Sequence, residues 1–188
     1  DSTVSGVRLP GMSSGDELIM TPFQMLTLYN VVANDGKMVK PMIVKSVLRS
    51  DMEVEYFDTE IINKKICSPK TLQQLQIMIE WVVERGTAKN INYSHYKIAG
   101  TTGTAKKAKN GRYVKEYYTS FAGYFPAEAP RYSCIVVIDN PKGYQIYGSD
   151  VSAPVFKEIA DKIYALEIEM NEIVTQEQTA VDGVYLYI

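Results

Sequence analysis

Three stretches of the chain place apolar residues three or four positions apart, which is the spacing of an amphipathic helix. The first stretch follows Thr21-Pro22-Phe23-Gln24, in which Thr21 and Gln24 predict a capping box and Pro22 suits the first helical position. Ser68 and Pro69 give the second stretch a similar start. We therefore expect helices over residues 22–34, 69–85 and 151–166.

Over residues 96–138 the pattern changes to shorter runs of β-branched and aromatic residues, which are typical of strands. We expect strands over 96–106, 117–125 and 132–138, with Asn110-Gly111 turning the chain between the first two. The third run is nearly all apolar, so we expect both of its faces to be buried. A short hairpin around Ser50 is predicted within residues 38–57, and residues 1–20 are expected to be loop.

These patterns predict an α+β fold in which an antiparallel sheet packs on helices. Hydrophobic residues make up 46% of the sequence, enough for a core, and no apolar run approaches the eighteen residues of a membrane span. The net charge of −2 predicts no attraction to nucleic acid. Two cysteines, Cys67 and Cys134, make no disulfide framework, and His95 has no ligand partners nearby, so we expect no metal and no cofactor.

One strand carries the most specific motif of the chain, Ile-Ala-Gly-Thr-Thr-Gly-Thr-Ala over residues 98–105. It resembles the third signature of penicillin-recognising enzymes, Lys-Thr-Gly-Thr, with Thr101 in the place of the lysine. Taken alone, the pattern also fits a β-branched edge strand with a glycine bulge. A glycine at 103 leaves room for a substrate and a nucleophile to approach the backbone.

The motif belongs to an ordered series of blocks. Together they resemble the C-terminal half of the transpeptidase domain of class B penicillin-binding proteins, and two blocks favour the division-specific type. The resemblance covers roughly residues 10–168. We therefore divide the chain into a transpeptidase part, 1–168, and a tail, 169–188, and we expect the tail to be a short strand or a disordered end. The blocks are residues 21–25, 82–88, 98–107, 111–113, 121–127 and 151–156.

The resemblance implies a serine D,D-transpeptidase that cross-links peptidoglycan stem peptides through an acyl-enzyme and that β-lactams trap. It implies that the hydroxyls of Thr102 and Thr104 bind the substrate carboxylate, with Gly103 between them. The backbone N–H of Thr104 would complete the oxyanion hole. Tyr117 and Tyr147 occupy places where family tyrosines wall the cleft, although ordinary hairpin and loop packing explains them equally well.

The threonine at 101 departs from the family pattern, because it cannot carry the positive charge of the lysine. Two other hypotheses therefore stay open beside the enzyme. One is a non-catalytic cell-wall or divisome scaffold module, and the other is a β-lactam sensor domain that acylates without transferring to an amine.

Two further patterns could indicate function and need interpretation. Ser94-His95-Tyr96-Lys97 matches the nucleophile motif Ser-x-x-Lys in form, but it lies beside a strand and no helix follows it, so we reject it. A basic cluster is interpreted as a solvated hairpin loop, with contact to an anionic polymer or partner as the alternative. That cluster comprises Lys106, Lys107, Lys109, Arg112 and Lys115.

The family resemblance also sets expectations about the parent protein. The nucleophile and the Ser-x-Asn motif would come from an N-terminal part of the same domain, so this chain alone would be inactive. The expected partners are stem peptides, β-lactams, that N-terminal part and division proteins. The expected location is the outer face of the bacterial cytoplasmic membrane, in the periplasm, with an N-terminal anchor outside this chain.

Overall fold

The computed structural model describes residues 20–184 except 51, 93, 94, 110 and 111. Side chains are described up to residue 168, leaving out 53, 108 and 112 as well. The expected loop over 1–20 and the expected Asn110-Gly111 turn therefore lie almost wholly outside the described residues. The last four positions, 185–188, do so too.

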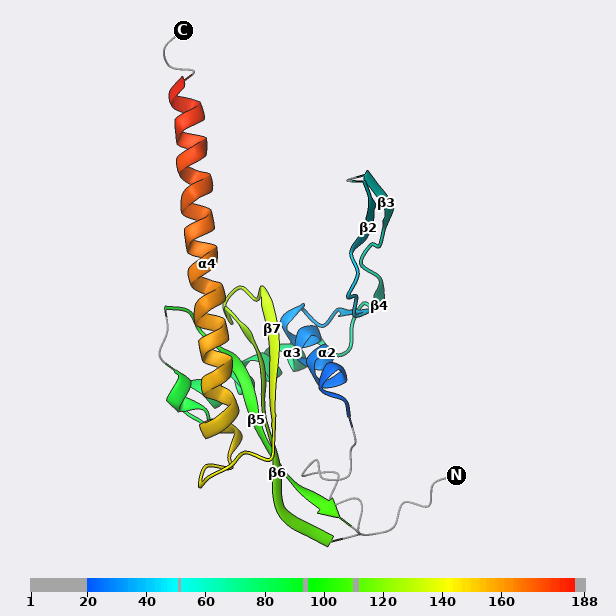
Figure 1. Ribbon diagram of the computed structural model, residues 1–188, viewed down its shortest axis with the longest axis vertical. Helices are drawn as coiled ribbons and strands as arrows, with labels where there is room; N and C mark the ends of the chain where they lie inside the picture. Colours follow the sequence, from blue (N-terminus) through cyan, green and yellow to red (C-terminus); the bar gives the residue numbers. More distant parts are fainter. Residues whose placement is uncertain (1–19, 51, 93–94, 110–111, 185–188) are drawn as a thin grey trace.

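A three-stranded antiparallel sheet forms the centre of the molecule (Figure 1). Its strands are β5 (Ala99–Lys109), β6 (Arg112–Phe125) and β7 (Tyr132–Asp139), in the order β5-β6-β7. The predicted meander and the predicted α+β class are confirmed. Strand β5 starts three residues later than expected, and β6 starts five residues earlier because pairing continues past a bulge between Lys106 and Ala108.

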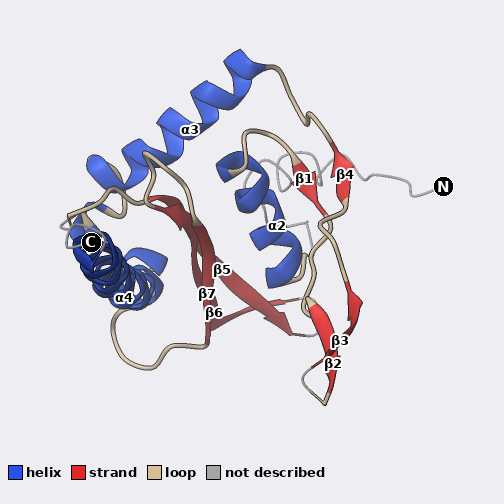
Figure 2. Ribbon diagram, turned by 90° about the horizontal axis from the view of Figure 1, so that it is seen from above, coloured by secondary structure: helices blue, strands red, loops and turns tan. Residues whose placement is uncertain are grey.

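Helices cover the sheet from two sides, as Figure 2 shows. Helix α2 (Pro22–Ala33) contacts β6 and β7, α3 (Pro69–Glu84) contacts β5, and α4 (Gly148–Val184) lies on the opposite face. The predicted caps are present. The Gln24 N–H donates to the Thr21 hydroxyl at 3.2 Å, and the Thr71 N–H donates to the Ser68 hydroxyl at 3.1 Å.

The main core lies between the sheet and α4. Phe121 and Phe125 of β6 meet Phe156 of α4 edge to face, with ring centroids 4.8 and 5.7 Å apart. Ala153 and Ala160 of α4 are fully buried beside them, so the helix lies close to the strands. A smaller cluster on the other face joins α2, α3 and the sheet through Val32, Leu72, Ala99 and Tyr124.

The prediction for the last helix was wrong at both ends. It was expected over 151–166, and α4 runs from Gly148 to Val184, which places Pro154 inside the helix. The helix continues because no glycine or proline occurs between Pro154 and Gly183, where Glu and Ala, both good helix formers, are common. The expected tail conformation was therefore wrong up to 184, while the boundary at 168 stays a prediction.

Among the described helices, none combines the length and apolarity that crossing a membrane requires.

Strand β7 is less buried than its apolar run predicted. Its residues are mostly half-buried, and Val137 is 41% exposed. The reason is that β7 forms the outer edge of the described sheet, where α2 and α4 each cover it only in part.

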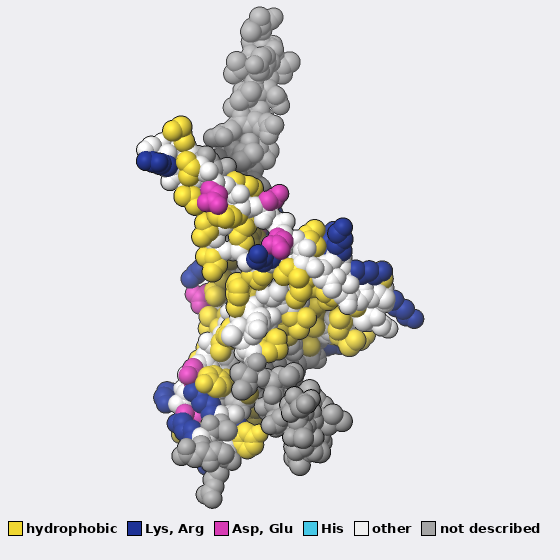
Figure 3. Space-filling view, turned by 90° about the vertical axis from the view of Figure 1, so that its right-hand side faces the viewer, with side chains coloured by type: hydrophobic (Ala, Val, Ile, Leu, Met, Phe, Trp, Pro, Cys, Tyr) yellow, Lys and Arg dark blue, Asp and Glu magenta, His cyan; other side chains and the backbone are white. Residues whose placement is uncertain are grey.

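A smaller part of the chain extends away from the sheet between α2 and α3 (Figure 1). Here β1 (Met38–Val39) pairs with β4 (Ile61–Asn63), and β2 (Ser46–Arg49) pairs with β3 (Met52–Tyr56) in the predicted hairpin. Large apolar side chains are exposed on this part and on α2 and α3, and Figure 3 shows such side chains spread over one face of the molecule. They include Phe23, Leu28, Leu48, Val54, Met78 and Trp81.

We expect the isolated chain to self-associate, because many large apolar side chains are exposed on this part and on the two helices, and such surfaces favour association. Sedimentation velocity at micromolar concentration should give species heavier than the 21.1 kDa monomer. The double variant Leu28→Gln/Met78→Gln should shift the distribution toward the monomer. A monodisperse wild-type monomer that melts cooperatively would contradict the expectation.

Tyr124 should make the stability of the chain sensitive to alkali. Burial, together with a smaller contribution from the charge of Glu80, raises the pKa of Tyr124 to about 12. Because the folded pKa lies above the ordinary value of about 10, its contribution is complete below about pH 10 and is lost as the pH rises toward about 12. Urea unfolding across this range should show a smaller loss in Tyr124→Phe than in wild type. Tyr144→Phe, at an exposed position, is the control and should behave as wild type.

Candidate active site

The Thr-Thr-Gly-Thr segment lies on β5, at the edge of the described sheet, where β5 pairs with β6 alone. The register sets Thr102 opposite Phe121, Gly103 opposite Ser120 and Thr104 opposite Thr119. The segment is half-buried up to Gly103, and Thr104 is exposed. The predicted edge strand is therefore present, and it is open along one side within the described residues.

The hydrogen-bond register tells which backbone groups of β5 face this open side. The Asn140 N–H donates to the Tyr117 carbonyl at 2.7 Å, so the odd-numbered residues of β6 bond toward β7. The even-numbered residues, including Ser120, therefore bond toward β5 and pair with Gly103. It follows that the N–H and C=O of Thr102 and Thr104 point to the free edge.

The same alternation separates the side chains of the motif between the two faces of the sheet. Thr102 and Thr104 share a face with their partners Phe121 and Thr119, and this is the face of α4, because the Thr119 hydroxyl lies 3.1 Å from that of Ser152. Thr101 lies on the other face, opposite Ala122. The two hydroxyls expected to bind a carboxylate are thus together, and the residue at the lysine position is across the sheet from them.

The start of α4 contacts the edge strand directly. The Gly148 N–H donates to the Thr104 hydroxyl at 3.1 Å. A methyl group at Gly148 would lie 2.4 Å from the Ser120 carbonyl oxygen and 2.7 Å from that of Gly103. Only glycine permits this approach, so Gly148 sets the distance between α4 and the motif. No role was predicted for Gly148, because nothing in the sequence distinguishes it from an ordinary loop glycine.

The end of α3 reaches the motif from the other direction. The Thr87 hydroxyl lies 3.1 Å from the Thr102 hydroxyl. Just beyond it, the short helix η1 (Lys89–Ile91) carries Asn90, whose amide donates to the Ser149 carbonyl at 2.7 Å. The ends of α3 and α4 are thereby joined beside β5. Thr87 belongs to the block 82–88 of the family resemblance, for which no function was predicted.

The two candidate tyrosines lie on this side of the sheet in different settings. Tyr117 of β6 pairs with Lys106 and shares the face of Thr119. Tyr147 precedes Gly148, is 59% exposed, and accepts the Asp150 and Val151 N–H groups through its carbonyl. Their roles at a cleft stay predictions, but both lie near the Thr104 end of the motif.

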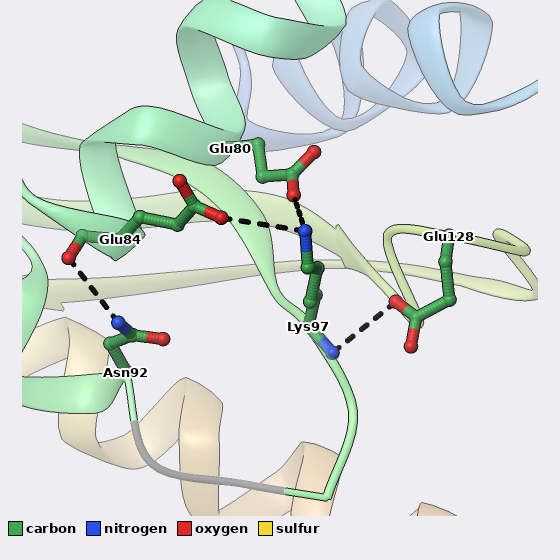
Figure 4. Close-up of polar contacts among 5 residues, drawn as sticks. All are labelled: Glu80, Glu84, Asn92, Lys97 and Glu128. Atoms are coloured by element: carbon green, nitrogen blue, oxygen red, sulfur yellow. Dashed lines mark hydrogen bonds and ion pairs between the residues drawn. The ribbon is translucent and has the colours of Figure 1, made fainter.

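Lys97 does not replace the missing family lysine. It lies before β5, and its ammonium contacts the carboxylates of Glu80 and Glu84 on α3, while its backbone N–H donates to Glu128 at 3.3 Å (Figure 4). The hydrogen bond with Glu80, followed by the charge of Glu80, raises the pKa of Lys97. This cluster fixes the entry into β5. Ser94, the other end of the rejected Ser-x-x-Lys match, lies outside the described residues.

Two of the lysines in the basic cluster are also engaged. Lys107 pairs with Asp139 and lies 4.3 Å from the ring centre of Tyr118, and Lys109 pairs with Glu116. Such pairing fits the interpretation of a solvated hairpin surface. Within the described part of the chain, no three His, Cys, Asp or Glu side chains converge as metal ligands.

Comparison with known proteins identifies the family. The profile of the penicillin-binding protein transpeptidase domain matches residues 8–161. The chain is 32% identical over 146 residues to stage V sporulation protein D of Bacillus subtilis, covering 75% of this chain and 22% of that protein. It is 29% identical over 177 residues to the peptidoglycan D,D-transpeptidase FtsI of Escherichia coli, covering 93% of this chain and 28% of that protein.

A solved structure agrees. Penicillin-binding protein 3 of Mycobacterium tuberculosis, in complex with aztreonam, superposes with a TM-score of 0.65 at 31% identity, covering 79% of this chain and 35% of that one. The fold is therefore that of part of a penicillin-binding protein transpeptidase domain. The chain belongs to the penicillin-binding protein transpeptidase family, as the resemblance predicted, and it spans about a quarter of the length of the relatives named here.

Replacing Gly148 with alanine should displace the start of α4 from the edge strand. The added methyl would overlap two carbonyl oxygens, and overpacking of this kind typically costs about 1–3 kcal/mol. Thermal unfolding should show a melting temperature lower by roughly 5 °C. Ser149→Ala, at the next residue, should leave it nearly unchanged. Equal melting temperatures for Gly148→Ala and wild type would show that the contact is not tight.

Proposed function

We propose that this chain forms the C-terminal part of a serine D,D-transpeptidase that cross-links peptidoglycan stem peptides and is acylated by β-lactams. The observation that carries the proposal is an open edge strand with two hydroxyls on one face and the Thr104 N–H at its free side. The family membership of the chain supports it. The nucleophile would come from the part of the parent protein outside this chain, so the chain alone would be inactive.

In the proposed reaction, a serine oxygen attacks the carbonyl of the terminal D-Ala-D-Ala peptide bond. The carbon–nitrogen bond breaks, D-alanine leaves with a proton, and an ester to the serine remains. The amine of a second stem peptide then attacks the ester, forms the cross-link and releases the serine. A β-lactam enters at the first step, and its opened ring remains attached to the serine.

Strand β5 suits the substrate side of this reaction. An extended stem peptide can add to the free edge through main-chain hydrogen bonds. The Thr102 and Thr104 hydroxyls would donate to the terminal carboxylate. The Thr104 N–H would stabilise the oxyanion, and losing such a donor in other enzymes costs about 3–4 kcal/mol of barrier.

Thr101 is the observation that favours a second candidate, a non-catalytic scaffold module of the cell wall or division machinery. A neutral side chain at this position leaves the substrate carboxylate without the family cation. A β-lactam sensor domain is a third candidate, which would acylate without turnover of stem peptides.

The transpeptidase proposal also includes the setting of the parent protein. We place the parent at the outer face of the cytoplasmic membrane, with an N-terminal anchor and in contact with division proteins.

Intact mass of the parent protein after incubation with benzylpenicillin tests the proposal. We expect a single stable adduct, because the edge strand carries the Thr102 and Thr104 hydroxyls on one face even with Thr101. No adduct with an intact upstream serine would support the scaffold module. An adduct without turnover of a stem-peptide thioester would support the sensor.

Introducing a lysine at position 101 should accelerate acylation. Position 101 lies on the opposite face from the two hydroxyls, so the added charge would attract the carboxylate around the strand edge without joining their hydrogen bonds. An exposed charge pair of this kind contributes about 0.5–1 kcal/mol, which corresponds to roughly 2- to 5-fold in the acylation rate constant. Thr59→Lys adds the same charge at an exposed position far from the motif along the chain and should leave the rate unchanged. An unchanged or lower rate in Thr101→Lys would show that this position does not act on the substrate carboxylate.

A further inference from the structure

The hydrogen bond between the Thr87 and Thr102 hydroxyls can run in either direction, and the proposed reaction requires one of the two. Each threonine hydroxyl has one proton to donate and can accept other hydrogen bonds. The two oxygens are 3.1 Å apart, so one hydroxyl donates to the other. In the free protein either direction is possible.

A bound carboxylate removes this freedom. An ionised carboxylate only accepts hydrogen bonds, so Thr102 must give its single proton to the substrate. The contact between the two threonines can then persist only if Thr87 donates to the Thr102 oxygen. A donor at Thr87 would also hold Thr102 in one rotamer and polarise its hydroxyl toward the anion.

Thr87 is held in a well-defined turn. The Arg85 N–H donates to the Trp81 carbonyl and the Ala88 N–H to the Val82 carbonyl, both at 3.0 Å. Ala88 is fully buried, and a methyl group at Gly86 would lie 2.8 Å from the Val82 backbone. The turn therefore has little room to relax, and it presents the Thr87 hydroxyl from a fixed position.

We propose that Thr87 is a positioning residue for carboxylate recognition, donating its hydrogen bond to Thr102 so that the Thr102 hydroxyl donates to the substrate carboxylate. The inference rests on the proposed function, because it needs a carboxylate-bearing ligand at β5. It also explains how recognition can proceed without a lysine at position 101. The anion then binds a Thr102 hydroxyl whose oxygen is already in contact with Thr87, and its arrival fixes the direction of the hydrogen bond between them.

The test compares two ligands in the full-length parent protein, benzylpenicillin and its methyl ester, which lacks the carboxylate charge. For each we would measure the second-order rate constant of acylation in wild type, Thr87→Val and Thr87→Ser. Valine keeps the shape of threonine and removes the donor, and serine keeps the donor. We expect Thr87→Val to lower the rate with benzylpenicillin by roughly 10-fold, about 1.4 kcal/mol. The rate with the ester should change less than about 2-fold, and Thr87→Ser should restore both.

Thr27→Val is the matched control, since the Thr27 hydroxyl donates to the Phe23 carbonyl on α2 at 2.8 Å. It should leave both rates at the wild-type level. If Thr87→Val fails to fold, Thr87→Ala provides the same comparison of the two ligands.

Equal losses with both ligands, or no loss with either, would overturn the role of Thr87 while leaving the transpeptidase proposal intact. A wild-type protein that neither ligand acylates would instead overturn the proposed function and this inference with it.

Discussion

The arrangement of the candidate site depends on the close approach of α4 to the edge strand at Gly148. At this point a helix start lies over the Gly103–Ser120 pair with no space for a side chain. The approach is possible because Phe121, Phe125 and Phe156 fill the region between α4 and the sheet, and small residues on α4 let the helix come near. Packing of the core thus determines where the Thr104 hydroxyl lies.

The second fixed point is the end of α3. Lys97 binds two carboxylates of that helix just before β5 begins, and Thr87 meets Thr102 just after the helix ends. The side chains of the edge strand are therefore held by the end of α3 at Thr102 and by the start of α4 at Thr104, while its outer backbone groups stay open. An open edge with fixed side chains is what binding of an extended peptide requires.

Local chemistry made much of this fold predictable from the sequence. Thr21 with Gln24 and Ser68 with Pro69 start helices for reasons that act within four residues, and the β-branched runs gave the three strands. Burial of β7 and the length of α4 were mispredicted, because the first depends on which elements cover a strand and the second on a run without helix breakers. The Thr87–Thr102 and Gly148–Thr104 contacts join residues 15 and 44 positions apart, so no periodic pattern indicates them. The family motif pointed to the threonines of β5, but the groups that position them became visible only in three dimensions.

We infer that β5 receives the carboxylate and the acyl carbonyl of the ligand. A crystal structure of the parent protein acylated by a penicillin would show whether it does. We expect the carboxylate within hydrogen-bond distance of the Thr102 and Thr104 hydroxyls, and the acyl oxygen facing the Thr104 N–H. A ligand carboxylate bound away from both hydroxyls, with β5 free of contact, would rule out this role of the strand.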